Sequence, residues 1–401
     1  THLPARVVEW RSGRTGSKRY QAELVAALNH PGFLWLSANV EALASDKLPR
    51  FLEKVTRRRR CLLVVDESHY VKNPRAQRTR ALVALSKSCP YRRTLTGTPA
   101  PQGPFDLWSQ YRILDPDVLG LRYTTFKRRY GEFRRVSYGG PAFDELVSYR
   151  NLDELERKIS PITFPRRKAD CLDLPPRIFA RRYFEMPPDH ARVYRELRDQ
   201  LVARLSSGEE ISAPHALTNL LRLQQISRGQ AYVPGTGARP LGPPYPAVDA
   251  TVELVLEHKG KSTVWCRFQA DVDQLYEALR VSGVEVVRCD GRTPQADRPE
   301  LLRTFRDNPA IRCWLGTLAT GGVGVDLGAA SLMVFYSHGF NLAERLQGLE
   351  RNYGSSQAAD RIEVVDLVAA DTVDDRALEV LARKEDLAAL LTGPRLKELL
   401  T

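Results

Sequence analysis

The chain has 401 residues, of which 43% are apolar and 27% charged, a composition typical of a globular protein with two or three domains. Lysine and arginine outnumber aspartate and glutamate by 60 to 48, which gives a formal net charge of +12. The excess is regional: residues 1–244 carry 42 basic and 24 acidic side chains, whereas residues 245–401 carry 18 and 24. The basic first part favours a polyanionic partner, although a GC-rich genome also produces arginine-rich sequences.

Composition also excludes several classes of protein. No apolar run approaches the roughly 20 residues that span a bilayer, and no apolar segment of a signal peptide follows residues 1–4. The six cysteines lie far apart and form no C-x-x-C pair, which argues against a zinc ribbon or a disulfide framework and for a reducing compartment. We therefore expect a cytoplasmic protein without a membrane partner.

In the first part, the sequence predicts strands at residues 32–36, 61–65 and 93–95. The run 61–65 is apolar throughout, which is typical of a parallel strand covered on both faces. Residues 104–230 instead look helical, and residues 232–246 are rich in glycine and proline and predict a linker.

In the second part, short apolar runs alternate with helical patterns from about residue 245 to residue 370. This alternation predicts a doubly wound α/β domain with a parallel sheet. The predicted strands are 263–266, 285–289, 311–315, 332–336 and 362–367, and the clearest helices are 271–281 and 300–305.

Two acids, Asp66 and Glu67, directly follow the predicted strand 61–65, and His69 comes two residues later. Ligands bind at the carboxyl ends of strands in open α/β sheets. The first carboxylate can hold Mg²⁺, the second can orient or deprotonate an attacking water, and His69 can couple the site to neighbouring segments. On the acids alone, a solvated strand end that caps the next helix is an equally good interpretation.

A second polar turn follows the predicted strand 93–95. The hydroxyls of Thr96 and Thr98, together with the intervening Gly97, can bridge the acid pair to a second domain. Taken alone, this segment is more often an ordinary turn built from threonine, glycine and proline.

Together these segments resemble the Swi/Snf-type branch of the superfamily 2 helicase-like ATPases. Residues 66–69 resemble its DEAH-type motif II, and residues 95–99 resemble motif III. In the second half, residues 320–327 resemble motif V, and residues 347–351 resemble the first part of motif VI. Other segments match in the same order, namely 72–74, 106–108, 161–168, 174–176 and 340–341.

The resemblance implies an α/β fold of two RecA-like lobes, each a doubly wound parallel sheet, with a helical insertion. We place the first lobe at 1–103, the insertion and lobe connector at 104–231, the linker at 232–246 and the second lobe at 247–401. The implied activity is that of a DNA-dependent ATPase, a translocase or helicase-like enzyme acting on duplex or branched DNA, with ATP and Mg²⁺ bound between the lobes. A bacterial cell or a phage-infected cell fits the absence of chromatin-binding modules.

By the same resemblance, Asp66 and Glu67 hold the metal, Glu67 also activates water, and Arg351 acts as an arginine finger that offsets charge on the γ-phosphate. The glycines of motif V lie near the nucleotide or the DNA backbone. The remaining candidates for the nucleotide site are His69, Gly322, Gly324, Asp326 and Gln347.

Aromatic and basic side chains interleave between residues 122 and 135. The rings at 123, 126, 130 and 133 have the spacing of a helical core stripe, so we assign the rings to packing and the basic face to phosphate contact. The family tracks duplex DNA mainly through its backbone, so little base specificity is expected. The candidates for nucleic-acid contact are Thr96, Thr98, Arg128, Arg129, Arg166, Arg167, Lys168 and Asn341.

Two features depart from the family's pattern. The second arginine of motif VI, three residues after Arg351, is replaced by Gly354, so either Arg351 suffices, another arginine substitutes, or hydrolysis is impaired. Motif I is missing, because no G-x-x-x-x-G-K-[ST] occurs and Gly260-Lys261-Ser262 precedes a predicted strand instead of following one. We therefore expect a chain truncated before motif I, and a fragment that is inactive alone.

Two competing hypotheses remain. One is a catalytically degenerate DNA-binding scaffold of the same fold, and the other is an RNA helicase of the same superfamily. ATP hydrolysis by the intact protein, and its stimulation by duplex DNA or by RNA, discriminates them. The sequence does not identify protein partners.

Overall fold

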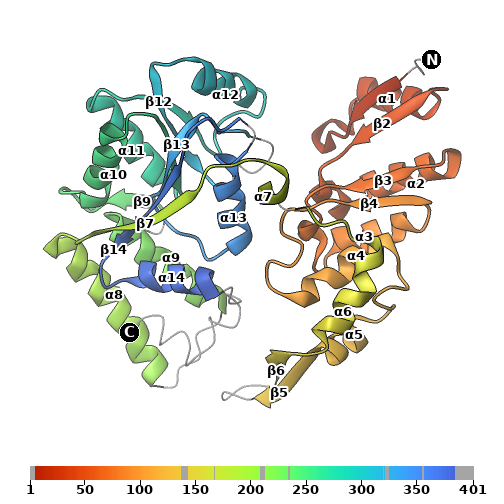
Figure 1. Cartoon of the computed structure of the whole chain (residues 1–401), viewed down its shortest axis with the longest axis horizontal. Helices are drawn as coiled ribbons and strands as arrows, with labels where there is room; N and C mark the ends of the chain where they lie inside the picture. The colour runs from red at the N-terminus through yellow and green to blue at the C-terminus, as the bar shows by residue number, and fades with distance from the viewer. Residues whose placement is uncertain are drawn as a thin grey trace. The chain divides into compact units, whose positions relative to one another are not determined.

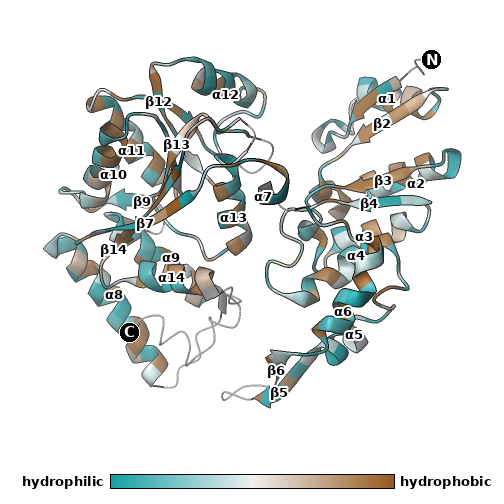
Figure 2. Ribbon diagram, in the orientation of Figure 1, coloured by the Kyte–Doolittle hydropathy of each residue, from teal (hydrophilic) through white to brown (hydrophobic). Residues whose placement is uncertain are grey.

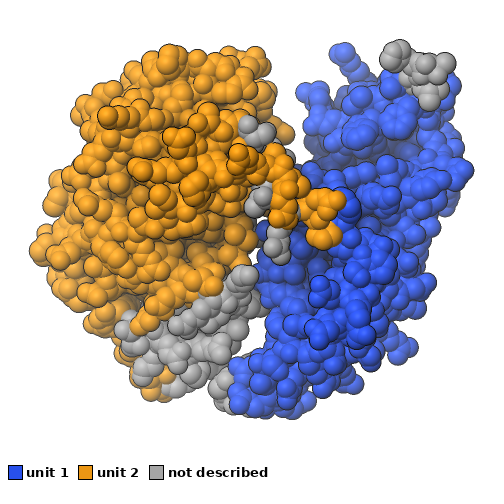
Figure 3. Space-filling model, viewed as in Figure 1, with its two compact units in different colours: residues 1–164 blue, residues 165–401 orange. Residues whose placement is uncertain are grey.

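The computed structural model describes residues 5–136, 143–166, 168–207, 213–233, 235–318, 320, 325–354 and 356–383. The chain forms two compact units, residues 1–164 and 165–401 (Figure 3). Their boundary falls inside the segment 104–231, and the domain limits drawn from the sequence stay a prediction. No helix in the described ranges is long and apolar enough to cross a membrane.

Unit 1 is built on two pairs of parallel strands with helices packed against them (Figure 1). The core between strands and helices contains Val8 of β1, Leu24 of α1, Phe51 of α2, Val65 of β3 and Leu82 of α3. The strands and α-helices of this unit are β1 (Ala5–Glu9), α1 (Lys18–Leu28), β2 (Phe33–Ser37), α2 (Lys47–Arg58), β3 (Leu62–Val65), α3 (Gln77–Ser86), β4 (Tyr91–Thr94), α4 (Leu107–Leu114), α5 (Tyr123–Tyr130), β5 (Gly131–Val136), β6 (Phe143–Tyr149) and α6 (Leu152–Ile159).

The prediction that strand 61–65 is covered on both faces is wrong for the described part of the chain. Leu62 and Val64 are 59% and 44% exposed, whereas Val65 lies in the core. The reason is that the core helices cover one face of these strands, and on the other face Val7, Phe33 and Trp35 are exposed as well. Figure 2 shows the hydrophobic residues along β1 to β3.

Unit 2 contains a six-stranded parallel sheet in the order β11-β12-β10-β13-β14-β7. Successive side chains of β10 point to opposite faces: Val264 packs with α10 and α11, and Trp265 packs with α12 and α13. Both faces are therefore covered, as all-parallel sheets require, and the predicted α/β fold with a parallel, doubly wound sheet is confirmed.

The elements of unit 2 match the predicted alternation closely. All five strands predicted between 263 and 367 are present, and the structure adds β7 at the edge of the sheet. The predicted linker 232–246 instead contains the end of one strand and all of another, which pair as a hairpin. The elements are α7 (Lys168–Cys171), β7 (Arg177–Phe184), α8 (Pro188–Ser206), α9 (Ala213–Ser227), β8 (Gln230–Val233), β9 (Gly237–Pro240), α10 (Pro246–Glu257), β10 (Lys261–Cys266), α11 (Gln269–Val281), β11 (Glu285–Cys289), α12 (Arg298–Asp307), β12 (Ile311–Thr317), β13 (Ala330–Phe335), α13 (Leu342–Arg351), β14 (Ile362–Ala369) and α14 (Val373–Arg383).

Segment 104–230 is less helical than predicted. It contains α4 to α9, but also the antiparallel hairpin β5–β6 and the strand β7. Gly131 begins the hairpin where space is short, because a Cβ at this position would lie 2.6 Å from the ring of Phe105. The rings of Phe105 and Phe133 thus leave no room for a side chain at this position.

Candidate functional site

The acid pair lies at the carboxyl end of β3, as predicted. Asp66 is exposed, and its Oδ1 accepts a hydrogen bond of 2.9 Å from the backbone N–H of Glu67. Glu67 has left-handed backbone angles, φ 47° and ψ 51°, before the 3₁₀ helix Ser68–Val71. Such a conformation is uncommon for a residue other than glycine and concentrates at functional sites, so the surrounding contacts must hold it in place.

His69 joins the acid pair to the threonine turn. Its Nδ1 lies 3.1 Å from Thr96 Oγ1 and 3.2 Å from Glu67 Oε2, and its side chain is only 5% exposed. Thr96 Oγ1 in turn accepts the backbone N–H of Thr98 at 3.1 Å and lies 3.5 Å from Glu67 Oε2. His69 and Thr96 thus connect the Glu67 carboxylate to residues 96–98.

Further hydrogen bonds fix the two turns to each other and to α4. The backbone N–H of Leu95 donates to the Val65 carbonyl at 2.8 Å, and the N–H of Ser68 donates to the Leu95 carbonyl at 3.0 Å. The hydroxyl of Ser68, which is fully buried, donates to Gln110 Oε1 at 2.6 Å, and Gln110 Nε2 donates to the Pro99 carbonyl at 2.6 Å. Buried polar pairs of this kind are expensive to leave unmade, so these contacts hold the two turns and α4 together. Asp66 itself is exposed, and Glu67 is the N-cap residue of the next helix, so the interpretation of the acids as a solvated strand end stays open.

The acid pair suits Mg²⁺ held partly by a nucleotide. No cluster of three or more histidine, cysteine, aspartate or glutamate side chains in the described ranges could hold a metal ion by itself. Mg²⁺ is commonly bound by one or two carboxylates together with phosphate oxygens and water. The two carboxylates of Asp66 and Glu67 fit that chemistry and do not form a complete protein site.

In unit 2, helix α13 carries the predicted residues of motif VI. Its inner side is fixed to the sheet: Arg345 makes two hydrogen bonds of 2.5 and 2.7 Å to the Asp366 carboxylate, and Leu349 is part of the core. Gln347 and Arg351 are four residues apart, so they lie on a common side of the helix, nearly opposite Leu349. The outer side of α13 therefore presents both predicted residues together.

The end of α13 is anchored by Asn352, which is fully buried. Its Nδ2 donates to Thr263 Oγ1 at 3.1 Å and to the Ala330 carbonyl at 3.2 Å, which connects the residue to β10 and β13. In addition, the backbone N–H of Leu327 donates to the Arg351 carbonyl at 2.9 Å. Arg351 is thus held between the sheet and the segment that follows the motif V glycines.

Asp326 has a structural part in the same segment. It is exposed, and its Oδ1 accepts hydrogen bonds from the backbone N–H of Gly328 at 2.9 Å and from Ser356 Oγ at 2.5 Å. The predicted residues Gly322 and Gly324 lie outside the described residues.

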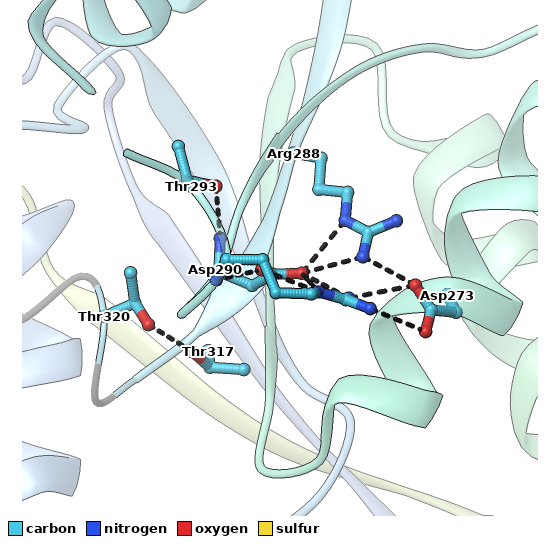
Figure 4. A network of polar contacts seen from close by, with 7 residues as sticks. Asp273, Arg288, Asp290, Thr293, Thr317 and Thr320 are labelled. Carbon is cyan, nitrogen blue, oxygen red and sulfur yellow. Dashed lines mark hydrogen bonds and ion pairs between the residues drawn. The ribbon is translucent and has the colours of Figure 1, made fainter. Parts of the chain in front are cut away.

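A polar network that the sequence reasoning missed lies at the carboxyl ends of β11 and β12 (Figure 4). Asp290 follows β11, is 1% exposed, and accepts hydrogen bonds from Arg288 and Arg292, with shortest distances of 2.9 and 2.6 Å. Both arginines also pair with Asp273, while Thr293 Oγ1 accepts the backbone N–H of Asp290 at 3.0 Å. An Asp-Gly-x-Thr turn directly after a predicted strand was the signal available in the sequence.

The basic candidates of α5 differ in their surroundings. Arg129 forms a two-pronged pair with the Glu154 carboxylate, with shortest contacts of 2.6 and 2.8 Å, and this pairing lowers the pKa of Glu154 to about 2. Arg128 is exposed. Phe126 and Tyr130 are buried, which agrees with the assignment of the rings to packing, although the last ring of the stripe belongs to β5 and not to the helix.

The other basic and polar nucleic-acid candidates, from residue 166 onward, belong to unit 2. Arg166 is exposed beyond α6, Arg167 lies outside the described residues, and Lys168 begins α7 with a side chain that is likewise not described. Asn341 precedes α13, is exposed, and donates to Glu344 Oε1 at 3.0 Å.

The lysine of the Gly-Lys-Ser sequence has a structural role. Lys261 opens β10, and its Nζ donates to the carbonyls of Phe305, Asn308 and Ile311 at 2.6 to 2.7 Å. This ammonium satisfies carbonyls at and after the end of α12, which agrees with the interpretation that this sequence is not a phosphate-binding loop.

Comparisons with known proteins place the chain in a family. Residues 40–231 match the SNF2-related domain, and residues 247–353 match the helicase conserved C-terminal domain. The chain belongs to the SNF2-related, or Swi/Snf, family of superfamily 2.

Curated relatives agree with this placement. An uncharacterized ATP-dependent helicase of Mycoplasma pneumoniae is 24% identical over 84% of this chain and 31% of its own length. TATA-binding protein-associated factor 172 of Homo sapiens is 24% identical over 81% and 20%, and the bovine DNA annealing helicase and endonuclease ZRANB3 is 24% identical over 84% and 30%. The chain thus spans less than a third of the length of these relatives.

Among solved structures, the Sulfolobus solfataricus SWI2/SNF2 ATPase core in complex with dsDNA is 22% identical and has a TM-score of 0.44. It covers 95% of this chain and 75% of its own length. The C-terminal part of the Fun30 ATPase domain is 16% identical, has a TM-score of 0.45, and covers 57% of this chain and 96% of its own length.

Proposed function

We propose that the intact protein is a DNA-dependent ATPase that translocates along duplex or branched DNA. The observation that carries this proposal is the contact of His69 with both Glu67 and Thr96. It joins the carboxylate that would act on water to the turn resembling motif III, so hydrolysis at one turn can move the other. Membership in the SNF2-related family supports the same activity.

In this proposal the residues have separate roles. Asp66 supplies a carboxylate to Mg²⁺, and Glu67 accepts a proton from water as the water oxygen bonds to the γ-phosphorus of ATP. The bond from that phosphorus to the leaving oxygen of ADP breaks, which yields ADP and inorganic phosphate. Arg351 offsets negative charge on the transferred phosphoryl group, while His69, Asp326 and Gln347 position neighbouring groups. The bound Mg²⁺ would neutralise phosphate charge.

The proposed polynucleotide is DNA bound through its backbone. The net positive charge of residues 1–244 supplies attraction for phosphates without base readout. A structural relative was solved in complex with dsDNA, and we extend that property to this protein as part of the proposal. Arg128, Arg166, Arg167, Lys168, Thr98 and Asn341 are the residues we assign to this contact.

Phosphate release by the intact protein, with and without duplex DNA or RNA, tests the proposal. We expect ATP hydrolysis that duplex DNA stimulates more than RNA does, and we expect Glu67→Gln to lower kcat by about 100-fold or more because the proton acceptor is lost. Glu53→Gln is the matched control, since Glu53 is an exposed acid on α2 and its only described ion pair is with Arg57.

Each outcome has a distinct meaning. If the wild type hydrolyses no ATP but still binds duplex DNA, the protein is a DNA-binding scaffold. Stronger stimulation by RNA would identify an RNA helicase instead. If wild type and Glu67→Gln hydrolyse ATP equally, Glu67 does not activate water.

A further inference from the structure

The outer side of α13 contains more charge than motif VI accounts for. Glu350 lies one turn after Gln347 and next to Arg351, so all three residues lie on neighbouring parts of one side of the helix. Glu350 Oε1 is 3.2 Å from Nη1 of Arg177, a residue at the start of β7 and 173 positions earlier in the sequence. A second arginine thus contacts the residue that directly precedes the predicted arginine finger.

Two features of the sheet direct Arg177 to this place. β7 pairs in parallel with β14, and Arg177 is opposite Ile362, whose side chain packs in the core on the α13 side. Residues opposite each other in a parallel pair point to the same face. The Arg177 guanidinium also stacks on Tyr353, with its carbon 3.9 Å from the ring centroid.

The guanidinium is held but still accessible to a ligand. Its side chain is 25% exposed, and that of its partner Glu350 is 40% exposed. Ion pairs at such exposure are weak, so a phosphate can replace the Glu350 carboxylate. Stacking on Tyr353 fixes the plane of the guanidinium and leaves its N–H donors at the edge, an arrangement suited to oxyanions.

The structure does not require glycine at position 354, where the family has its second arginine. Gly354 does not have a positive φ, and a Cβ built there meets no atom within 4 Å, so neither backbone conformation nor packing requires glycine. A side chain can therefore start at this position without a clash of its Cβ.

We propose that Arg177 is the second cation of the phosphate site, supplied from β7 in place of an arginine at position 354. This inference rests on the proposed ATPase function and assigns one further catalytic residue to it. Arg177 contacts the phosphoryl group together with Arg351, and Glu350 holds its guanidinium when no phosphate is bound.

Compensation between the two positions tests the inference. We compare Arg177→Ala, Gly354→Arg and the double variant in the intact protein. Arg182→Ala is the matched control, because Arg182 also lies on β7 and forms an exposed ion pair, 3.3 Å from Glu253. The measurements are kcat with duplex DNA, affinity for ADP alone and for ADP with fluoroaluminate, and the midpoint of thermal unfolding.

We expect Arg177→Ala to lower kcat by about 100-fold, as the loss of one charge-stabilising donor typically does, and to weaken binding of ADP with fluoroaluminate by a similar factor. Binding of ADP alone should change little, because the group contacts the transferred phosphoryl. In the double variant, Gly354→Arg should restore at least a tenth of the wild-type kcat. Arg182→Ala should resemble the wild type in every assay.

Three results would overturn the inference. The first is an unchanged kcat in Arg177→Ala, and the second is a loss of kcat that follows thermal destabilisation and is not restored by Gly354→Arg. The third is equal weakening of ADP and of ADP with fluoroaluminate. The binding measurements distinguish failure of this inference from failure of the proposed function, because they can be read even in a protein that does not turn over ATP.

Discussion

Replacing Arg228 with alanine tests whether helices α8 and α9 belong structurally to the second lobe. Arg228 follows α9, is 2% exposed, and lies 2.8 Å from the Asp374 carboxylate, which is 1% exposed. Its guanidinium also donates to the carbonyls of Tyr336 and Leu367 at 2.7 and 3.0 Å, at the carboxyl ends of β13 and within β14. One side chain therefore connects the helical pair to the sheet.

The expected loss of stability comes from the buried groups that alanine leaves without a partner. Alanine leaves the Asp374 carboxylate buried without its cation, and breaking one partner out of a buried pair costs about 3–5 kcal/mol. The two carbonyls also lose a charged donor, so the upper part of that range applies. For a unit of this size, such a loss lowers the midpoint of thermal unfolding by on the order of 10 °C.

Urea unfolding followed by circular dichroism measures the difference. Arg192→Ala is the control, because this exposed arginine of α8 pairs only with Glu196 among the described residues, and its removal should cost about 0.5 kcal/mol or less. Combining Arg228→Met with Asp374→Asn should recover part of the stability, since no buried charge then lacks a partner. Equal midpoints for Arg228→Ala and the wild type would refute the reasoning.

Three further predictions concern single side chains. Thr96→Val keeps the shape of the side chain but removes the hydroxyl that contacts His69. We expect the stimulation of ATP hydrolysis by DNA to fall about 10-fold, while the affinity for ADP is retained. Unchanged stimulation would exclude coupling through the contact between His69 and Thr96. Burial raises the pKa of Asp271 to about 7 from an ordinary value of 3.8. The folded state therefore binds this proton more tightly than the unfolded state does. Each unit by which the pH rises between about 4 and 7 thus lowers the free energy of unfolding by about 1.4 kcal/mol. The stability of Asp271→Asn relative to the wild type should rise from pH 5 to pH 7 and then level off, and a difference independent of pH would contradict this. Lys261→Met should lower the free energy of unfolding of unit 2 by about 1–3 kcal/mol, because three carbonyls lose a donor. A urea unfolding curve of the variant equal to that of the wild type would contradict this role of Lys261.

The strands of the second lobe could be predicted because each is a short, nearly continuous apolar run. Strand 285–289 was predicted with the bounds that β11 has, and the strand predicted at 263–266 lies within β10. β7 was missed because its sequence, residues 177–184, contains three arginines and becomes a strand through its pairing with β14. Strand β14 follows nearly 180 residues later, so no local sequence pattern predicts that residues 177–184 form a strand.

Some residues of the candidate site could likewise be predicted from the sequence, and others could not. The acid pair, His69 and the threonine turn could be named in advance because each follows a recognisable strand. The contacts of Asn352 could not, since an asparagine is ordinarily a surface residue and only burial among specific partners gives it a structural role. The place of Arg177 beside Glu350 is likewise a consequence of sheet register and not of any motif.

The structure also changes the meaning of the basic excess in residues 1–244. Arg228 is buried in the second lobe, Arg59 donates to the carbonyls of His30 and Gly32, and Arg129 is paired with a carboxylate. These three cations stabilise the fold or neutralise a neighbour, so the formal charge overstates what a polyanion can meet. In the proposed DNA contact, attraction for the phosphates must therefore come from exposed side chains such as Arg128, and the affinity should be correspondingly sensitive to salt.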